Sequence, residues 1–244
     1  MNVAIVTDNI YLANALEEII ESQCLYVSYS FTYFCSPGSP MNEAEFNQKV
    51  TPIRLKTDAN QLIGNYGIVL SAHCKQIFPP ALVQSARCAN IHPGLNPYNR
   101  GWFPQVFSIL NGDPWGATFH IIDKELDHGD IIAQERLELQ SWDTSLSAYL
   151  RVQEAEVKLL RNHLKAFLTG EAVTTSPVGN GNVNLKADFN ELCALDLNAV
   201  GTLKDHIDLL RALTHGDYNN AYFVDKETGD EIYVGISLYR EKSK

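Results

Sequence analysis

Short apolar runs alternate with amphipathic stretches over the first two thirds of the chain. Residues 3–6 (Val-Ala-Ile-Val) are apolar and rich in β-branched side chains, which predicts a strand buried on both faces. Leucines and isoleucines then recur at helical spacing, and Asp8 or Asn9 is placed to cap a helix that runs to about Ser22. Further strands are predicted at residues 25–31, 66–70, 88–92, 118–122 and 131–137.

A long amphipathic helix is predicted over residues 144–168, with Asp143 as its N-cap and Gly170 as its stop. Strands that alternate with helices favour an α/β fold, with a Rossmann-like, doubly wound and mostly parallel sheet. The first strand is followed by Thr-Asp-Asn at residues 7–9 rather than by G-x-G-x-x-G, so no dinucleotide site is expected there.

The composition shifts near residue 174, where a loop-like stretch rich in Gly and Asn begins. We therefore expect two domains, one over residues 1–173 and a C-terminal one over residues 174–244. The second should hold a helix near residues 200–213 and a β-hairpin from strands at 221–224 and 231–237. An isolated two-stranded hairpin is only marginally stable, so we expect a homodimer formed through this hairpin.

Charge and cysteine content narrow the class of protein. The net charge is −10 over 244 residues and no basic face is apparent, which argues against nucleic-acid partners but allows a small anionic ligand. The five cysteines have no close CxxC spacing, so reduced thiols are expected rather than a disulfide framework or a zinc ribbon. Neither a signal peptide nor an apolar run of the ~20 residues needed for a membrane span is present, and a cytoplasmic protein is expected.

The candidate chemistry lies at the end of the strand predicted over residues 88–92. Asn90 and His92 alternate along it, so both side chains share one face, and Pro-Gly at 93–94 turns the chain away from them. An amide can donate to a carbonyl oxygen as it becomes negative, and an imidazole, with an ordinary pKa of about 6.5, can move the proton of a nucleophile. Asp127, in a polar turn, is a candidate partner for His92. Taken alone, the Asn90/His92 spacing is better explained by a hydrogen-bonded histidine at a strand end, and Asp127 by a surface aspartate in a turn.

Three ordered pieces of the chain resemble the formyltransferase family that uses N10-formyltetrahydrofolate. They are Asn-Ile-His-Pro-Gly at 90–94, Gly-Ala-Thr-Phe-His at 116–120 and Asp-His-Gly-Asp-Ile-Ile at 127–132. The resemblance implies that Asn90, His92 and Asp127 form a catalytic triad and that no metal is needed. It also implies that the folate lies near Ser71, Lys75, Gln76, Ile77, His128 and Gly129. A solvated loop position is the alternative for Lys75, and His120 is expected to be a partly buried strand residue.

Residues 96–105 and 210–223 are similar to the narrower group of nucleotide-sugar N-formyltransferases. This resemblance implies transfer of a formyl group to the amine of a dTDP-linked amino-dideoxy sugar, in O-antigen or lipopolysaccharide biosynthesis. dTDP-4-amino-4,6-dideoxyglucose is favoured, and the dTDP-3-amino-3,6-dideoxy isomer is the near alternative. The sugar-nucleotide residues it implies are Asn9, Tyr98, Arg100, Trp102, Gln105, Arg211, Asn220 and Tyr222.

Arg100 is the leading candidate for the diphosphate, because a guanidinium can bind phosphate through two hydrogen bonds. Core packing for Trp102 and a structural salt bridge for Arg211 are the simpler alternatives. Two rival functions also remain open. A formyltetrahydrofolate hydrolase would use the same triad with water as acceptor, and a non-catalytic nucleotide-sugar binder would leave the triad incidental. Formylation of a tRNA would require a basic C-terminal domain, which is not present.

Overall fold

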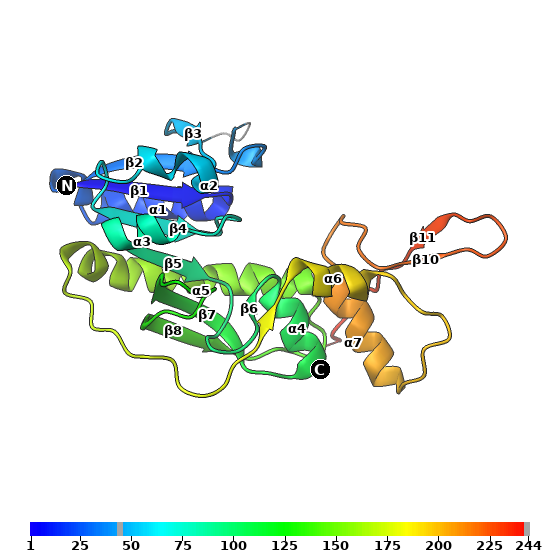
Figure 1. Ribbon diagram of the computed structural model, residues 1–244. Coiled ribbons are helices and arrows are strands. Elements are labelled where there is room, and N and C mark those ends of the chain that lie inside the picture. The colour runs from blue at the N-terminus through cyan, green and yellow to red at the C-terminus, as the bar shows by residue number, and fades with distance from the viewer. Residues whose placement is uncertain (43–45, 242–244) are drawn as a thin grey trace.

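The computed structural model describes residues 1–42 and 46–241, and these residues form a seven-stranded sheet with the order β3-β2-β1-β4-β5-β7-β8 (Figure 1). Neighbouring strands from β3 to β5 are parallel, whereas β7 runs antiparallel to both β5 and β8. The predicted Rossmann-like, mostly parallel sheet is therefore confirmed. The strands are β1 (Asn2–Thr7), β2 (Ser30–Cys35), β3 (Val50–Pro52), β4 (Ile68–Ala72), β5 (Arg87–His92), β7 (Trp115–Ile121) and β8 (Ile131–Leu137).

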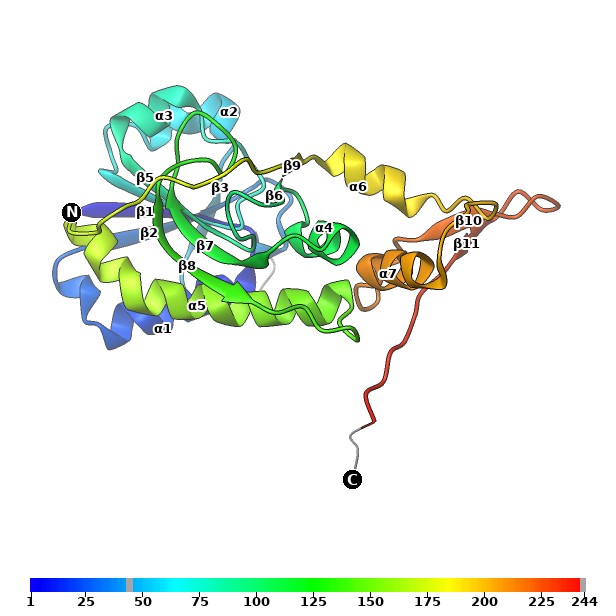
Figure 2. The same cartoon turned by 90° about the horizontal axis from the view of Figure 1, so that it is seen from below.

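Helices cover both faces of the sheet, which is why β1 is apolar along its length. Val3 and Ile5 pack into one core with helices α1 (Ile10–Ser22) and α5 (Ser145–Thr169). Ala4 and Val6 face the opposite core, on the side covered by α2 (Leu55–Asp58) and α3 (Pro80–Ser85) (Figure 2). The apolar run thus reflects burial on both sides.

The strand expected at residues 25–31 is wrong in position. Residues Leu25–Val27 form a 3-10 helix, η1, and β2 starts only at Ser30. Cys24 has a φ of 53°, in the left-handed region, and this turn brings the chain back after α1. Leu25 is buried in the core with α1 and Tyr29 packs against it, whereas Val27 is 86% exposed. The buried part of the real strand is Tyr33 to Cys35.

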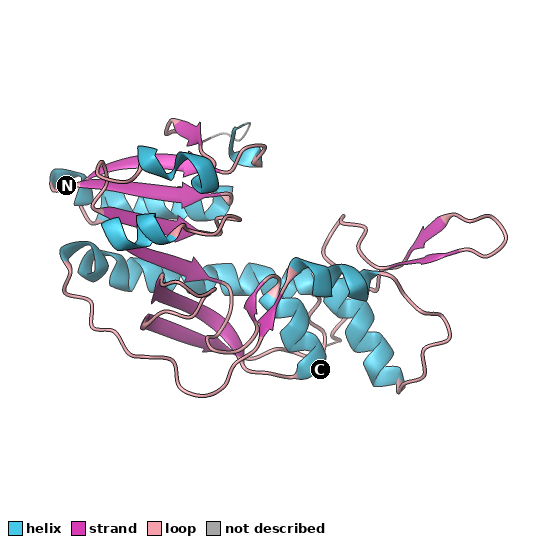
Figure 3. Cartoon of the chain, viewed as in Figure 1, coloured by secondary structure: helices cyan, strands magenta, loops and turns pink. Residues whose placement is uncertain are grey.

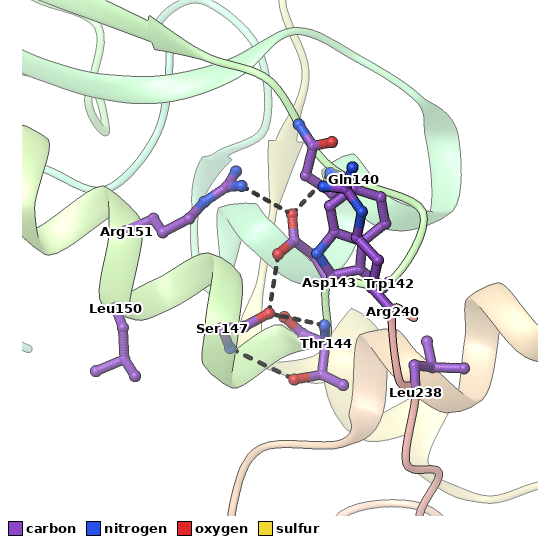
Figure 4. Close-up of a pocket in the computed structure, with 9 residues that line it drawn as sticks. All are labelled: Gln140, Trp142, Asp143, Thr144, Ser147, Leu150, Arg151, Leu238 and Arg240. Carbon is purple, nitrogen blue, oxygen red and sulfur yellow. Dashed lines mark hydrogen bonds and ion pairs between the residues drawn. The ribbon is translucent and has the colours of Figure 1, made fainter. Parts of the chain in front are cut away.

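Helix α5 begins one residue later than the Asp143 cap implied. Thr144 is the N-cap, because its hydroxyl accepts from Ser147 N while Ser147 Oγ accepts from Thr144 N (Figure 4). The Asp143 carboxylate instead accepts from Gln140 N at 2.7 Å and lies 3.3 Å from Nη1 of Arg151. The helix ends at Gly170, with φ 83°, as expected. Its C-terminal part runs beside the sheet, and its N-terminal part extends beyond the sheet toward α4 and α7 (Figure 2).

The C-terminal part of the chain forms two helices and a hairpin (Figure 3). Helices α6 (Lys186–Cys193) and α7 (Leu203–Leu213) share an apolar core with α4 (Pro104–Asn111). The hairpin of β10 (Tyr222–Val224) and β11 (Glu231–Tyr233) is antiparallel and projects from the body of the molecule (Figure 1). Its second strand is shorter than predicted, and α4 and α6 had no sequence prediction. The remaining short elements are η2 (Pro40–Asn42), η3 (Ala59–Gln61), β6 (Arg100–Gly101) and β9 (Val183–Asn184).

The segment that follows residue 173 lies against the first domain. Thr175 bridges to Ile131, the first residue of β8, and β9 pairs in parallel with β6. The domain boundary at 173/174 therefore stays a prediction. The core of packed C-terminal helices begins only at α6. Within residues 1–42 and 46–241, no helix has the length and apolar character needed to cross a membrane.

Candidate active site

Strand β5 presents Asn90 and His92 on one face, as their spacing predicts. The antiparallel register with β7 places His120 directly opposite Asn90 and Thr118 directly opposite His92. Thr118 Oγ1 donates to Gly94 O at 2.7 Å, and this bond holds the turn that follows the strand. Asn90 and His92 consequently sit at the carboxyl end of a strand, where open α/β sheets bind ligands.

Asp127 is brought to both of these residues. It has a φ of 46°, in the left-handed region that Asp tolerates better than most residues, and its carbonyl accepts from Asn96 Nδ2 at 2.7 Å. Its Oδ1 accepts from Asn90 Nδ2 at 3.1 Å, and its Oδ2 accepts from Gly101 N at 3.1 Å. Oδ2 also lies 3.6 Å from Nδ1 of His92. The structure therefore joins the amide, imidazole and carboxylate proposed as a triad.

His120 is a fourth member of this group that sequence reasoning did not assign to it. Its Nε2 lies 3.4 Å from Asp127 Oδ1 and 3.5 Å from Asn90 Nδ2, and its side chain is only 1% exposed. The expectation of a partly buried strand residue underestimated its burial. The sequence signal that could have identified His120 is the pairing of β7 with β5. A residue paired directly with Asn90 has its side chain on the same face of the sheet as Asn90.

Burial controls the ionisation of the central pair. Burial is the largest influence on His92 and lowers its pKa to about 4, against the opposing effect of the Asp127 charge. Smaller effects of His120, His73 and Arg100 act in the same direction as burial. Burial by itself would raise the pKa of Asp127, but His92 and hydrogen bonds from His120 and Gly101 hold it well below its usual range. His92 is therefore a neutral base at neutral pH, and not a group poised near 6.5.

Two atoms of this group have no hydrogen-bond partner among the described residues. They are Nε2 of His92 and Oδ1 of Asn90, and both are buried. A buried polar atom left without a partner is costly, so such atoms at a strand end indicate a ligand-binding position. A nitrogen that can accept a proton, next to an amide oxygen that can accept a hydrogen bond from an attacking amine, fits an acyl group that is attacked by an amine.

A cavity of about 430 Å³ opens in front of these atoms. Its walls come from the carboxyl ends of β1 and β4, the loop after β4, the segment at 101–105 and the turn at 122–127. From β1 the chain continues to β2 and β3 on one side of the sheet, and from the neighbouring β4 it continues to β5 on the other side. Ligands of doubly wound sheets bind at this switch point.

The residues expected to contact folate divide into two sets. Ser71, Lys75, Gln76 and Ile77 line the cavity, and Ile77 is an apolar side chain left 81% exposed at its edge. His128 does not line it, because its imidazole bonds to Asp123 Oδ2 at 2.8 Å in a largely exposed pair. Gly129 is buried instead against the backbone at Ile121, where an added Cβ would lie 2.0 Å from the carbonyl oxygen.

The residues expected to contact the sugar nucleotide also divide. Asn9, Trp102 and Gln105 line the cavity, whereas Tyr98 does not. Arg100 stands beside it, and its Nη1 donates to Leu126 O at 3.3 Å while its buried Nε has no partner among the described residues. Arg100 thus retains hydrogen-bonding capacity next to the cavity, which suits an anionic ligand.

The structure does not bring Arg211, Asn220 and Tyr222 to the cavity. Arg211 is buried in α7, where its Nε lies 2.6 Å from Asp208 Oδ1 and its Nη1 donates to Asp143 O at 2.8 Å. Asn220 Nδ2 donates to Leu213 O, and Tyr222 packs against Tyr233 across the hairpin. These polar groups bind other parts of the chain and hold the C-terminal elements in place.

A larger hollow, of about 750 Å³, lies at the start of α5 below the C-terminal segment (Figure 4). Arg240 stacks over the ring of Trp142 there, 4.5 Å from its centroid. Asn90, His92 and Asp127 do not line this hollow. Over residues 1–42 and 46–241, no cluster of three or more potential metal ligands is found.

Comparison with known proteins agrees with this geometry. Residues 37–164 match the family described as formyl transferase, and residues 188–240 match the N-formyltransferase dimerization C-terminal domain. The chain therefore belongs to the formyl transferase family. It is 50% identical, over 182 residues, to the dTDP-4-amino-4,6-dideoxyglucose formyltransferase of Mycobacterium tuberculosis (strain ATCC 25618 / H37Rv), a match that covers 75% of this chain and 77% of the relative.

Two solved structures are similar over nearly the whole chain. A sugar N-formyltransferase from Shewanella sp FDAARGOS_354 superposes with a TM-score of 0.92 at 43% identity, covering 99% of both chains. A 4-N formyltransferase from Francisella tularensis gives a TM-score of 0.91 at 42% identity, covering 98% of both. Two of these three relatives are described by name as formyltransferases that act on sugars.

Proposed function

We propose that this protein transfers the formyl group of N10-formyltetrahydrofolate to the 4-amino group of dTDP-4-amino-4,6-dideoxyglucose. The observation that carries the proposal is the convergence of Asn90, His92 and Asp127 on one cavity, with His92 Nε2 buried there without a partner. The identity of 50% to a relative that bears this activity in its name supports the choice of sugar. The product would be a formamido sugar for a surface polysaccharide such as O-antigen.

His92 acts as the base in this proposal. Because burial lowers its pKa to about 4, the imidazole is neutral at neutral pH and Nε2 is free to accept a proton from the attacking amine. The ionised carboxylate of Asp127, 3.6 Å from Nδ1, then stabilises the imidazolium that forms. The folate supplies an acyl group that is already activated.

Asn90 stabilises the charge that develops on the formyl oxygen. Its amide nitrogen carries two hydrogens, and one of them is donated to Asp127 Oδ1 at 3.1 Å. The second faces only a long contact of 3.5 Å to Nε2 of His120, and it donates to the formyl oxygen as that becomes negative. Removal of one such donor lowers kcat about a hundred- to a thousandfold in other acyl-transfer enzymes. The bond to Asp127 fixes the amide, so no reorganisation is needed during the reaction.

The substrates are held from two sides of the cavity. The folate lies against the loop of Ser71, Lys75, Gln76 and Ile77. The side chain of Gln76 is bonded to Leu55 N and Ile53 O, so this residue positions the loop and offers its main chain to the ligand. The sugar nucleotide lies toward Asn9, Trp102 and Gln105, with Arg100 as the partner of the diphosphate.

The protein acts as a homodimer in the cytoplasm, in which the hairpin β10–β11 pairs with a second copy. The match of residues 188–240 to a domain named for dimerization supports this assembly. The exposed apolar side chains of the hairpin, including Ile232 and Tyr233, also support it, because burial against a second copy removes them from water. A hairpin that is too short to be stable alone gains strands by this pairing.

The function is tested by incubating the purified protein with N10-formyltetrahydrofolate and, separately, dTDP-4-amino-4,6-dideoxyglucose, the dTDP-3-amino-3,6-dideoxy isomer, or no sugar. Mass spectrometry measures the formamido sugar and absorbance measures tetrahydrofolate. We expect the two products in equal amounts with the 4-amino sugar. Tetrahydrofolate release without sugar would identify a hydrolase, formamide only from the 3-amino isomer would reassign the substrate, and no turnover at all would favour a binding protein.

A further inference from the structure

A second pair of a histidine and a carboxylate faces the same cavity, outside the group around Asp127. His73 follows strand β4 and lines the cavity, and its Nε2 lies 2.7 Å from Oε1 of Glu156. The side chain of His73 is 11% exposed and that of Glu156 is fully buried. Neither the triad nor the proposed binding of the two substrates uses this pair.

Glu156 is an unusual residue for its position. It lies on α5 among the apolar side chains that pack against the sheet, next to Ala155 and one turn before Leu159 and Leu160. Burial of a carboxylate is expensive, and an apolar residue of similar size is often at least as stabilising at such a position. Its second oxygen, Oε2, has no partner among the described residues. The stability of α5 therefore does not account for this carboxylate.

The backbone of His73 is also held in a costly conformation. Its φ is 56°, in the left-handed region that residues other than glycine rarely adopt. This turn directs the imidazole from the end of β4 toward α5 and the cavity. Such conformations cost of order 1–3 kcal/mol and cluster at functional sites. The site lies at the switch point between β1 and β4, where the fold binds its ligand.

Asn9 fixes the hydrogen bonds at the other nitrogen of His73. As N-cap of α1, its Oδ1 accepts from Leu12 N at 3.0 Å, so its amide nitrogen must point into the cavity. That nitrogen lies 2.9 Å from the Tyr149 hydroxyl and 3.2 Å from His73 Nδ1. The Tyr149 oxygen accepts from Asn9 and lies 3.1 Å from His73 Nδ1. It can therefore donate its own hydrogen to Nδ1 and still accept one from a ligand.

A formyltransferase that acts on an amino sugar has two protons to remove. The amine is largely an ammonium ion at neutral pH, because amines with electron-withdrawing neighbours have a pKa of about 8. One proton must leave before the nitrogen can attack, and a second leaves after the C–N bond forms. His92 accepts the second and returns it to the departing folate nitrogen. The first proton, which the overall reaction releases to water, needs another acceptor.

We propose that Tyr149, His73 and Glu156 form a path that takes this first proton from the sugar ammonium. The inference rests on the proposed function. The ammonium nitrogen donates a proton to the Tyr149 oxygen, and the original hydroxyl proton of Tyr149 passes to His73 Nδ1. The amine is then neutral, Tyr149 is again a phenol, and His73 is an imidazolium paired with Glu156. His73 returns its proton to water through the cavity once the product has left.

The groups around Tyr149 are consistent with this direction of transfer. Burial and the charge of Glu156 raise the pKa of Tyr149, so the tyrosine relays a proton and does not remain ionised. From the C-terminal part, His215 packs on the Tyr149 ring with Tyr218 beyond it, and His215 Nδ1 bonds to Ser145 Oγ at 2.9 Å. From the sheet, the neighbouring charged groups are Asp8, His92, His120 and Asp127. Asp8 is occupied by the N–H groups of Ser36 and Lys75. His92 and His120 are both paired with Asp127.

The test compares the pH profile of kcat/KM from pH 6 to 9 for the wild type, Tyr149→Phe and Glu156→Gln. Without the path, only sugar that is already a free amine reacts, and the free-amine fraction falls about tenfold for each pH unit below ~8. The ratio of the variant's kcat/KM to that of the wild type should therefore fall about tenfold for each of these pH units. Near pH 9 both should approach the wild-type value. Tyr218→Phe removes a hydroxyl from the outer ring of the same stack, and its profile should match that of the wild type.

A deficit that is the same at every pH would overturn the path, because a purely structural role does not depend on the ionisation of the substrate. Full activity of Tyr149→Phe at pH 6 would overturn it as well. Thermal melting of each variant shows whether it is folded. If Glu156→Gln is unfolded, the pH profile of Tyr149→Phe alone decides whether the path exists. A wild-type protein that forms no formamide rejects the proposed function itself, which separates that failure from failure of the path.

Discussion

The carboxylate of Asp127 lies 3.6 Å from the imidazole Nδ1 of His92, although the two residues belong to separate segments of the chain. The antiparallel pair β5–β7 and the turn after β7 bring them together, and Asn90 joins them through Asp127 Oδ1. The negative charge is therefore fixed next to the base before any ligand binds. The consequences of this arrangement can be measured one residue at a time.

Asp127→Asn keeps the size of the side chain and removes its charge. The imidazolium of His92 then loses its stabilising partner, and we expect kcat to fall by roughly a hundred- to ten-thousandfold, the range seen when the acid of a catalytic triad is neutralised. Steady-state kinetics of formamide formation measure the change. Asp130→Asn, an exposed residue of the same turn bonded to Ser176, should keep the wild-type kcat. An Asp127→Asn variant with near-normal kcat would contradict the role given to this carboxylate.

Gly94 gives the imidazole of His92 its space. A Cβ at this position would lie 2.5 Å from His92 Nε2, so Gly94→Ala must displace the ring. A displacement of about 1 Å in a catalytic group commonly lowers the rate about a hundredfold, and we expect a loss of this size in kcat. Gly67→Ala is the matched control, because its Cβ would make only an ordinary contact at 3.7 Å with Met1 Sδ. Equal kcat values for the two variants would show that the ring position is not critical.

The pKa of His92 also predicts how stability depends on pH. The folded protein holds this pKa at about 4, below the ordinary value near 6.5, so the unfolded chain binds more protons between these values. Stability should therefore be complete above pH ~6.5 and fall by about 2–3 kcal/mol between pH 7 and 4.5 through this group. Asp127, whose pKa is lowered, loses its contribution only at lower pH.

Urea unfolding at several pH values measures this effect. His92→Gln removes the titrating group, so its free energy of unfolding should change less than that of the wild type between pH 7 and 4.5. Parallel curves for the two proteins would mean that His92 titrates with an ordinary pKa in the folded state.

Much of the fold could be predicted because its signals are local. The apolar β1, the strand β8 and the amphipathic α5 are long enough for periodicity to reveal them. The error at residues 25–31 arose at a short apolar run that forms a 3-10 turn, which periodicity alone does not distinguish from a strand. Helix α4 follows Phe103, whose φ of 51° gives no side-chain cap, although Pro104 at its first position and Gly112 at its end are usual signals that the sequence prediction missed.

The site was predictable only in part for a related reason. Asn90 and His92 lie two residues apart on one strand, and the motif pieces pointed to Asp127. His120, His73 and Glu156 come from β7, the loop after β4 and α5, and only the tertiary fold brings these segments to one cavity. Arg211 shows the opposite error. The resemblance of residues 210–223 assigned it to the sugar nucleotide, but its hydrogen-bond partners in the structure are Asp208 and main-chain carbonyls of the protein itself.

Arg211→Met tests this structural assignment. The change leaves Asp208 with only the exposed Lys204 as its ion-pair partner and removes the hydrogen bonds to the carbonyls of Gln140 and Asp143. Because Lys204 still offsets the charge of Asp208, we expect the free energy of unfolding to fall by about 1–3 kcal/mol, the usual cost of buried polar groups left without partners. Chemical denaturation measures it. A stability equal to that of the wild type would indicate that Arg211 is not an essential part of the C-terminal core.

The most direct test of the account is the kcat for formamide formation by His92→Gln, measured at pH 7.5 with saturating formyl-folate and dTDP-4-amino-4,6-dideoxyglucose. Loss of the base should lower kcat by about a hundred- to ten-thousandfold, while His206→Gln, on α7, keeps the wild-type value. If His92→Gln retains kcat within about tenfold of the wild type in a folded protein, a catalytic base at the end of β5 is contradicted.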